Sequence, residues 1–187
     1  YEGEGLLRSI SGSARGTKLN TLEGLDTRPT LDRVKESLFN IIQDKIYGAR
    51  VLDLFSGSGA LALETLSRGA EFAYLCDNSK KAVQIIKENV AKTHFESKAK
   101  ILNMEYNKAI EYLKKEQFDI IFLDPPYKTE FDVEAIKLIK ENNMLLNEGR
   151  IILETDRADE KKKILEKLDI NIYDIRKYGR VSLFFLN

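Results

Sequence analysis

Short apolar runs alternate with amphipathic stretches along most of the chain, from about Gly48 to the C-terminus. Each apolar run has the length of one buried strand, and the stretches between them show helical periodicity. Strands that alternate with helices predict a mostly parallel sheet covered by helices on both faces. The predicted strands are VLDLF (51–55), FAYLC (72–76), KAKILN (98–103), FDIIFL (118–123) and RIILE (150–154), and the predicted helices span about 58–68, 79–93, 106–115, 132–141 and 157–167.

Both ends of the chain depart from this alternation. At the C-terminus, DINIYDIRKYG and RVSLFFLN are separated only by a glycine turn, so these two strands must pair antiparallel. At the N-terminus, the Gly-, Ser- and Thr-rich stretch 6–24 predicts a β-hairpin, and an apolar stripe predicts a helix from about Thr30. We therefore expect an α/β fold with a seven-stranded, mostly parallel sheet and an antiparallel C-terminal hairpin. Residues 1–27 are predicted to form a small hairpin extension, and residues 28–187 the main domain.

Composition narrows the class of protein only slightly. The 187 residues suffice for one domain with a buried core, and 30 basic residues balance 30 acidic ones. No overall field therefore attracts a polyanion, and any contact with nucleic acid depends on a local patch. The basic side chains between residues 8 and 35 are one candidate, although a solvated surface explains them equally well.

Several functional classes find no support in the sequence. The single Cys76 lies in an apolar run, which favours a small buried side chain over a nucleophile. Neither a disulfide framework nor zinc-ligand spacing occurs, so a reducing compartment is expected. No apolar run reaches the length of a membrane span, and no signal peptide is visible. We expect a cytoplasmic monomer that needs no metal and contacts no membrane.

The stretch LDLFSGSGALALE joins a buried strand to a helix through Gly57 and Gly59. Glycines let the backbone turn sharply and approach a ligand, and the start of a helix presents N–H groups that lack partners within it. The stretch fits the loose dinucleotide-binding pattern G-x-G-x-x-G/A, so it indicates a nucleotide-type ligand. A tight turn without any ligand remains the alternative.

Acidic residues beside this turn bear on which nucleotide it binds. Asp77 ends the next strand, where a carboxylate commonly accepts hydrogen bonds from ribose hydroxyls; its alternative role is to stabilise the start of the following helix. Asp53 precedes the turn and would repel a pyrophosphate but attract a sulfonium and an ammonium group. This favours S-adenosylmethionine over NAD. After the third strand, Glu105 or Tyr106 is a candidate for contacting the adenine, unless both merely begin a helix.

The stretch FDIIFLDPPYK (118–128) ends a buried strand in a carboxylate, two prolines and a tyrosine. A carboxylate in this place is costly to desolvate unless it has a partner. Asp124 and the Pro125 carbonyl, fixed by the adjoining proline ring, can accept the two N–H bonds of an exocyclic amine. Tyr127 can stack on the base that carries this amine. The stretch therefore predicts a site for a flat molecule with an amino group, and a plain turn is the alternative.

Together, LDLFSGSGALALE and FLDPPY resemble the D/N-P-P-Y/F class of amino-group methyltransferases, which have a Rossmann-like class I fold. More narrowly, SGSARGTKL and RPTLDRVKESLFNII, which precede those motifs, make the chain similar to the bacterial 16S rRNA guanine-N2 methyltransferase family (RsmD type). The likeness covers nearly the whole chain from about Ile10. Lys35 stands where arginine is common in that family and Asp77 where glutamate is common, and the N-terminus is atypical. Neither substitution removes a group that the reaction needs.

The resemblance implies transfer of a methyl group from S-adenosylmethionine, leaving S-adenosylhomocysteine, to the exocyclic N2 of a guanine. The implied partner is 16S rRNA or an assembling small ribosomal subunit. The implied catalytic residues are Asp124, Pro125, Pro126 and Tyr127. The implied cofactor-binding residues are Arg28, Thr30, Asp53, Phe55, Ser56, Gly57, Gly59, Asp77, Asn78, Glu105 and Tyr106. The candidate RNA-binding residues are Arg8, Arg15, Lys18, Arg33 and Lys128.

Three other functions remain open from the sequence. An adenine-N6 methyltransferase acting on DNA or RNA would use the Asp-Pro-Pro-Tyr stretch equally well. An NAD-dependent oxidoreductase would use the glycine turn but would leave Asp-Pro-Pro-Tyr unexplained. A non-catalytic RNA-binding module would bind RNA without S-adenosylmethionine.

Overall fold

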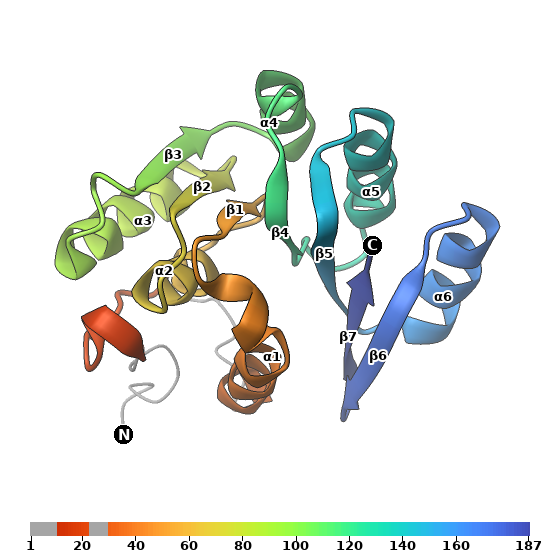
Figure 1. The fold of residues 1–187 in the computed structure, drawn as a ribbon, viewed down its shortest axis with the longest axis horizontal. Helices are drawn as coiled ribbons and strands as arrows, with labels where there is room; N and C mark the ends of the chain where they lie inside the picture. The colour runs from red at the N-terminus through yellow and green to blue at the C-terminus, as the bar shows by residue number, and fades with distance from the viewer. Residues whose placement is uncertain (1–10, 23–29) are drawn as a thin grey trace.

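A computed structural model describes residues 11–22 and 30–187 of the chain, with residues 30 and 31 described by their backbone alone. Its strands form a seven-stranded sheet in the order β3-β2-β1-β4-β5-β7-β6 (Figure 1). The strands are β1 (Arg50–Asp53), β2 (Phe72–Asp77), β3 (Ala99–Asn103), β4 (Phe118–Leu123), β5 (Leu145–Thr155), β6 (Ile172–Tyr178) and β7 (Val181–Leu186). The helices are α1 (Thr30–Ile46), α2 (Ala60–Ser67), α3 (Lys80–Thr93), α4 (Tyr106–Leu113), α5 (Phe131–Glu141) and α6 (Ala158–Lys167).

The directions of the strands confirm the predicted sheet. Strands β1 to β5 pair in parallel, whereas β7 runs antiparallel between β5 and β6. The turn between β6 and β7 includes Gly179 at φ 63°, a left-handed conformation that glycine adopts without strain. The carboxyl ends of the parallel strands meet at one edge of the sheet, which is where ligands of open α/β folds bind.

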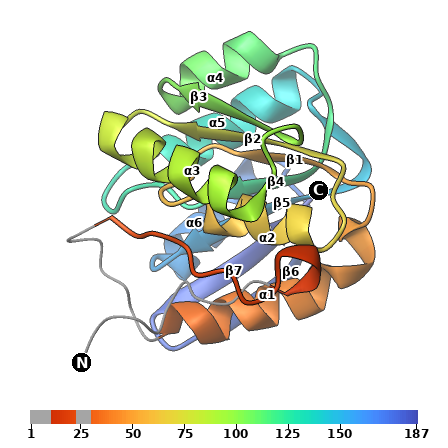
Figure 2. The ribbon, with the colours of Figure 1, turned by 90° about the vertical axis from the view of Figure 1, so that its left-hand side faces the viewer.

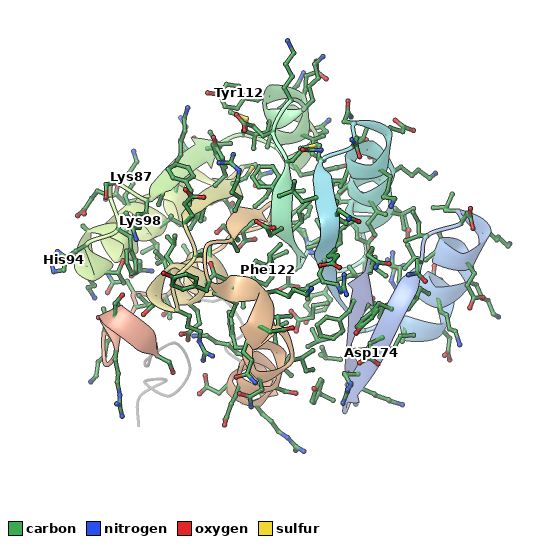
Figure 3. The ribbon with its side chains drawn as sticks, viewed as in Figure 1. Lys87, His94, Lys98, Tyr112, Phe122 and Asp174 are labelled. Atoms are coloured by element: carbon green, nitrogen blue, oxygen red, sulfur yellow. The ribbon has the colours of Figure 1, made fainter. Side chains whose placement is uncertain are left out.

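Helices cover both faces of the sheet and enclose two apolar clusters. Helices α1, α2 and α3 lie on one face, and α4, α5 and α6 lie on the other (Figure 1). Because side chains alternate along a strand, Phe122 enters the first cluster and Leu123 the second. Phe122 lies in the middle of the molecule (Figure 3), with its ring centroid 6.4 Å from that of Phe39 on α1. The same alternation decides which face each residue at a strand end points to.

Most predicted element boundaries lie close to the observed ones, and β5 differs most. This strand begins at Leu145 rather than Arg150, because Phe118 of β4 pairs with Leu145 before the register shifts. Strand β1 ends at Asp53 rather than Phe55, so the chain leaves the sheet just before the glycine turn.

The described part of the N-terminal extension, residues 11–22, contains no β-strand, so the predicted hairpin is wrong for these residues. Instead, a short 3₁₀ helix, η1 (Gly12–Ala14, red in Figure 2), packs against α2. Residues 1–10 and 23–29, which include the predicted domain boundary at 27/28, lie outside the described residues.

Side chains of α2 supply the hydrogen bonds that a partner strand would have supplied. The Ala14 N–H donates to Ser67 Oγ at 2.9 Å, and the Ser11 N–H donates to Glu64 Oε2 at 2.9 Å. The approach at Gly12 (φ 86°) is so close that a Cβ there would lie 2.0 Å from the Ser67 carbonyl oxygen. Only glycine fits this position, so the extension is packed directly onto the main domain.

A buried amide fixes the other end of this segment. Asn89 of α3 is fully buried, and its Oδ1 accepts the Asn20 N–H at 2.6 Å while its Nδ2 donates to the Asn20 carbonyl at 2.9 Å. The same Nδ2 group donates to the Ser58 carbonyl in the glycine turn at 2.8 Å. One side chain therefore connects the N-terminal segment to the turn that precedes α2.

The single cysteine and the single histidine of the chain differ in exposure. Cys76 is fully buried, and burial raises the pKa of its thiol to about 12, as expected for an inert apolar position. His94 is exposed at the end of α3 (Figure 3). Within the described residues, no helix is long and apolar enough to cross a bilayer, and no group of three or more acidic, histidine or cysteine side chains could hold a metal ion.

Candidate active site

A cavity of about 850 Å³ opens at the carboxyl edge of the sheet. Its wall combines the glycine turn after β1, the ends of β2 and β3, and the segment that follows β4. It thus brings the two motifs that the sequence places some 65 residues apart into one enclosure. Of the predicted site residues, the wall contains Asp53, Phe55, Ser56, Gly57, Asp77, Asn78, Glu105, Tyr106, Asp124, Pro125, Pro126 and Tyr127.

The two glycines of the turn have different surroundings. Gly57, at φ 59°, faces open space, since a Cβ there would meet nothing within 4 Å. Its backbone is therefore accessible to a ligand. Gly59, at φ 84°, lies outside the cavity wall, and a Cβ there would come within 3.1 Å of Leu75 Cδ2. Gly59 therefore permits close packing of the turn on β2, and direct contact with a cofactor stays an untested prediction.

Asp53 is an almost fully buried carboxyl group in the cavity wall. Burial raises its pKa from the ordinary value of 3.8 to about 7, although hydrogen bonds from Ser56 Oγ (3.2 Å) and the Phe55 N–H (3.4 Å) favour the charged form. A buried carboxyl group that ionises near neutrality is well suited to a positively charged ligand, which would hold it in the carboxylate form.

Asp77 connects the end of β2 to the glycine turn. One carboxylate oxygen accepts the Gly57 N–H at 2.9 Å, and the other accepts the N–H of Ser79, the residue that caps α3, at 2.9 Å. Both roles weighed for Asp77 are therefore compatible, because the side chain supports the helix start while lining the cavity. Asn78 follows it in the same wall.

Aromatic rings form one side of the cavity. Phe55 lies nearly parallel to Phe131, with centroids 6.5 Å apart and an interplanar angle of 4°, and Tyr106 contacts both rings. The Tyr106 hydroxyl donates to the Glu134 carboxylate, and burial and this carboxylate raise the pKa of Tyr106. Because that hydroxyl already has a partner, Tyr106 offers a flat wall, and the exposed Glu105 remains the polar candidate for contacting an adenine.

Sequence reasoning missed Phe131 and Glu134. Both lie at the start of α5 and line the cavity. An aromatic residue at a helix start after Tyr127 is indistinguishable by pattern from a core residue. Its 39% exposure, which is high for such a large apolar side chain, is visible only in the folded protein.

The Asp124–Tyr127 stretch follows β4 directly and faces the cavity. The Tyr127 side chain is 56% exposed, as a ring that stacks on an incoming base would be before the base arrives. The Pro126 carbonyl accepts the Thr129 hydroxyl at 2.9 Å, which folds the chain back after the tyrosine. The same stretch also lines a small hollow of about 30 Å³ on the side of α6.

Cations near α6 hold the far end of this stretch. Lys161, a lysine with only 1% exposure, lies 3.0 Å from the buried Asp132 carboxylate and 3.1 Å from Glu130. Arg157, just before the helix, contacts Glu130 at 3.1 Å and donates to the Thr129 carbonyl at 2.8 Å. The segment that carries Asp124–Tyr127 is thus anchored at both ends, by β4 and by these ion pairs.

Of the predicted RNA-binding residues that the structure describes, one lies next to the cavity and three do not line it. Lys128 is exposed beside Tyr127 and lines the small hollow, whereas Arg15, Lys18 and Arg33 are exposed at positions outside the cavity wall. Arg8, Arg28 and the side chain of Thr30 lie outside the described residues.

The residues of the cavity fit S-adenosylmethionine. The open backbone at Gly57 admits a ligand, the buried Asp53 suits its positive groups, and the Asp77 carboxylate can accept ribose hydroxyls. The rings of Phe55 and Phe131 offer a flat apolar surface. This fold and this cavity define the protein as a Rossmann-like, S-adenosylmethionine-dependent methyltransferase.

The chain belongs to the family described as "Conserved hypothetical protein 95", whose family model matches residues 7–187. It is 42% identical to "Putative rRNA methyltransferase YlbH" of Bacillus subtilis, over 82% of this chain and 85% of that protein. It is 37% identical to "Ribosomal RNA small subunit methyltransferase D" of Escherichia coli, over 83% of this chain and 78% of that protein. A solved structure, "Putative methyltransferase yhhF from Escherichia coli", superposes with a TM-score of 0.77 at 30% identity, covering 96% of each chain. The resemblance to the RsmD type is thereby confirmed.

The raised pKa of Asp53 predicts that S-adenosylmethionine binding depends on pH. If Asp53 lies beside the positive groups of the ligand, those groups favour its ionised form, so binding below pH 7 must release a proton and the affinity must rise with pH. Between pH 5.5 and 6.5 we expect about a tenfold gain per pH unit, since one pKa unit corresponds to a tenfold change. Titration calorimetry at pH 6.5 in two buffers of different ionisation enthalpy counts the released proton.

The variant Asp53→Asn is the control, because it keeps the shape and cannot ionise. It should bind without proton release, and equal proton counts in the two proteins would contradict the assignment. The free energy of unfolding depends on pH in the opposite direction from the affinity for S-adenosylmethionine. Between about pH 4 and 7 the unfolded chain ionises Asp53 while the folded protein keeps it protonated, so the free energy of unfolding falls as pH rises.

Proposed function

We propose that the protein transfers the methyl group of S-adenosylmethionine to the exocyclic N2 of a guanine in 16S rRNA, either free or within an assembling small subunit. The supporting observation is that Asp124–Tyr127 and the turn at Gly57 line one cavity. A methyl donor held by the turn and an amine held by Asp124 would then face each other. Relatives named as methyltransferases of ribosomal RNA support the choice of substrate.

The chain's own groups prepare the amine for attack. The exocyclic amine of guanine is a weak nucleophile, because its lone pair is delocalised into the ring. Asp124 accepts one N–H bond and the Pro125 carbonyl accepts the other, which favours a pyramidal nitrogen with an available lone pair. S-adenosylmethionine, when bound, supplies an electrophilic methyl group on a positively charged sulfur.

Methyl transfer also requires that the two reactants be aligned and that the proton of the attacking amine be accepted. The N–C bond forms as the C–S bond breaks, and the nitrogen gives up one proton only after the methyl group has arrived, with Asp124 as its first acceptor. Tyr127 stacks on the base, which is worth about 1–3 kcal/mol per base. Holding both reactants in line supplies much of the remaining acceleration.

Nucleoside analysis tests the proposal. The purified protein is incubated with labelled S-adenosylmethionine and, in separate reactions, with small subunits, naked 16S rRNA and duplex DNA. Digestion should yield labelled N2-methylguanosine from ribosomal RNA alone. Labelled N6-methyladenosine would establish the rival adenine chemistry, and a protein that binds S-adenosylmethionine but labels no substrate would contradict the methyltransferase proposal.

Arg15 and Lys18 are candidates for phosphate contacts, because both are exposed on the docked N-terminal segment. If both neutralise phosphates, the double variant Arg15→Glu/Lys18→Glu should reduce the slope of log K against log salt by about 1.4, or roughly 0.7 per contact. Binding of 16S rRNA by filter retention at several salt concentrations measures this slope.

The matched control is Lys137→Glu/Lys140→Glu, which makes the same change of charge on α5, on the other face of the sheet. A slope that changes equally in both double variants would show a general effect of net charge. An unchanged slope in Arg15→Glu/Lys18→Glu would remove these two residues from the RNA interface.

A further inference from the structure

The cavity extends beyond Asp124 onto the sheet face that α1 covers. This part of the wall is built by α1, β4, β5 and β7, whereas the glycine turn and Asp77 belong to the β1–β2 side of β4. Asp124 thus stands between two parts of one cavity, and the part next to α1 is left for an acceptor base if the methyl donor occupies the part beside the glycine turn. Its wall contains Val34, Leu38, Phe122, Ile152, Glu154 and Leu183.

Glu154 is a carboxylate among otherwise apolar residues of that wall. In the register of β4 and β5, Leu123 pairs with Leu153, so the next residues, Asp124 and Glu154, are neighbours at the ends of adjacent strands. Alternation along β5 puts Glu154 on the same face as Ile152, which belongs to the α1-side cluster. Both cavities beside the Asp124–Tyr127 stretch include Glu154 in their walls.

No cation neutralises this carboxylate among residues 11–22 and 30–187. Lys35, which lines the same cavity, lies 3.3 Å from Glu64 Oε1. Arg157, from the neighbouring hollow, pairs with Glu130 at 3.1 Å. Glu154 is therefore an acceptor-only group beside a flat apolar wall, and the ligand that satisfies it must bring N–H or O–H donors.

Guanine and adenine differ in the atom next to the exocyclic amine. In guanine, the N2 amine adjoins N1–H, so its Watson–Crick edge offers two neighbouring donors. In adenine, the N6 amine adjoins N1 with a bare lone pair. A carboxylate beside the amine site would bond to guanine and would repel adenine, because it would face that lone pair. Enzymes that act on a base outside the stack read this edge by hydrogen bonds.

Given the proposed function, on which this inference rests, we propose that Glu154 determines the choice of base. Its carboxylate accepts the N1–H of the target guanine while Asp124 and the Pro125 carbonyl hold the N2 amine. Glu154 is thereby a specificity residue that contacts the substrate beside the reacting atom. The rival adenine chemistry, which Asp-Pro-Pro-Tyr alone permits equally, is disfavoured by the residue on the neighbouring strand.

A cycle of protein and base substitutions tests this contact. The variant Glu154→Met, which removes the acceptor oxygens at similar side-chain length, is compared with the wild type on 16S rRNA carrying either guanine or 2-aminopurine at the methylated position. The RNA is used naked or assembled, whichever form the wild type methylates. 2-Aminopurine keeps the N2 amine and lacks the N1–H. Wild-type kcat/KM should fall by about 10- to 100-fold on this analogue, as expected for a lost bidentate base contact.

Glu154→Met, which has no acceptor oxygen, should lose a similar factor on guanine, and its penalty for 2-aminopurine should largely disappear. The matched control is Glu148→Met, the same change at an exposed position of β5 at the other end of the strand. The melting temperature and the dissociation constant for S-adenosylmethionine should match the wild type in both variants.

Two results would overturn the role of Glu154 while leaving the proposed function intact. In one, Glu154→Met methylates guanine at the wild-type rate. In the other, it is slower but keeps the full penalty for 2-aminopurine, as a merely structural residue would. If wild-type protein methylates adenine in these assays instead, the proposed function fails, and the assignment of Glu154 fails with it.

Discussion

Replacing Asp124 by alanine is expected to lower kcat for methyl transfer by about 10²- to 10³-fold, the usual effect of removing one preorganised polar partner of a transition state. In the proposed mechanism, this carboxylate is the acceptor that the amine nitrogen needs while it becomes pyramidal and acquires positive charge. The conservative variant Asp124→Asn keeps an acceptor oxygen and should retain much more activity, since the D/N-P-P-Y/F class accepts either residue. Single-turnover methylation of small subunits measures all three proteins.

The control measurements separate chemistry from binding. Asp124 follows β4 and is not among the residues of the glycine turn, so the dissociation constant for S-adenosylmethionine should change less than about threefold, below 1 kcal/mol. Asp156→Ala, an exposed carboxylate just beyond β5, should behave as the wild type. Wild-type turnover in Asp124→Ala would remove this residue from the mechanism.

Replacing Lys161 by methionine is expected to reduce the free energy of unfolding by about 3–5 kcal/mol, because it leaves the buried Asp132 carboxylate without its cation. For a chain of this length, the melting temperature should fall by roughly 10 °C. Thermal and urea unfolding measure both quantities. The matched control is Lys162→Met, the next residue of α6, whose exposed side chain should contribute within about 0.5 kcal/mol.

A second variant shows that the loss comes from the unpaired charge. The double variant Lys161→Met/Asp132→Leu removes both buried charges and should recover most of the lost stability. Equal stabilities of Lys161→Met and Lys162→Met would contradict the ion pair. The pair also holds the segment after Tyr127, so Lys161→Met should lower kcat even at temperatures where it stays folded.

The parallel part of the sheet could be predicted from sequence because its central strands, such as β1 and β4, are buried on both faces and separated by helices. A run such as FDIIFL has the length and composition of a buried strand, and the helical stretches on either side of it favour a parallel sheet. The N-terminal segment could not be predicted in the same way. Its Gly, Ser and Thr residues suggest a hairpin, but Ser11, Ala14 and Asn20 bond to side chains of distant helices. Local composition does not contain those partners.

The part of the candidate site that could be predicted lies in two motifs with distinctive backbone conformations. Glycine and proline favour particular backbone conformations, so the sequence itself indicates the turn at Gly57 and the stretch that begins at Asp124. Phe131 and Glu154 were missed because their types are ordinary at a helix start and a strand end. Their places in the cavity wall depend on the strand register and on exposure, which only the assembled sheet defines.

The amide of Asn89 has a consequence for how the cavity fluctuates. It is bonded at once to Ser58 on one wall and to Asn20, beside the cavity-lining Thr21, on another. Because Asn89 belongs to α3, these hydrogen bonds couple both walls to any displacement of that helix. We therefore expect the distance between the two walls to vary less than the position of α3 itself.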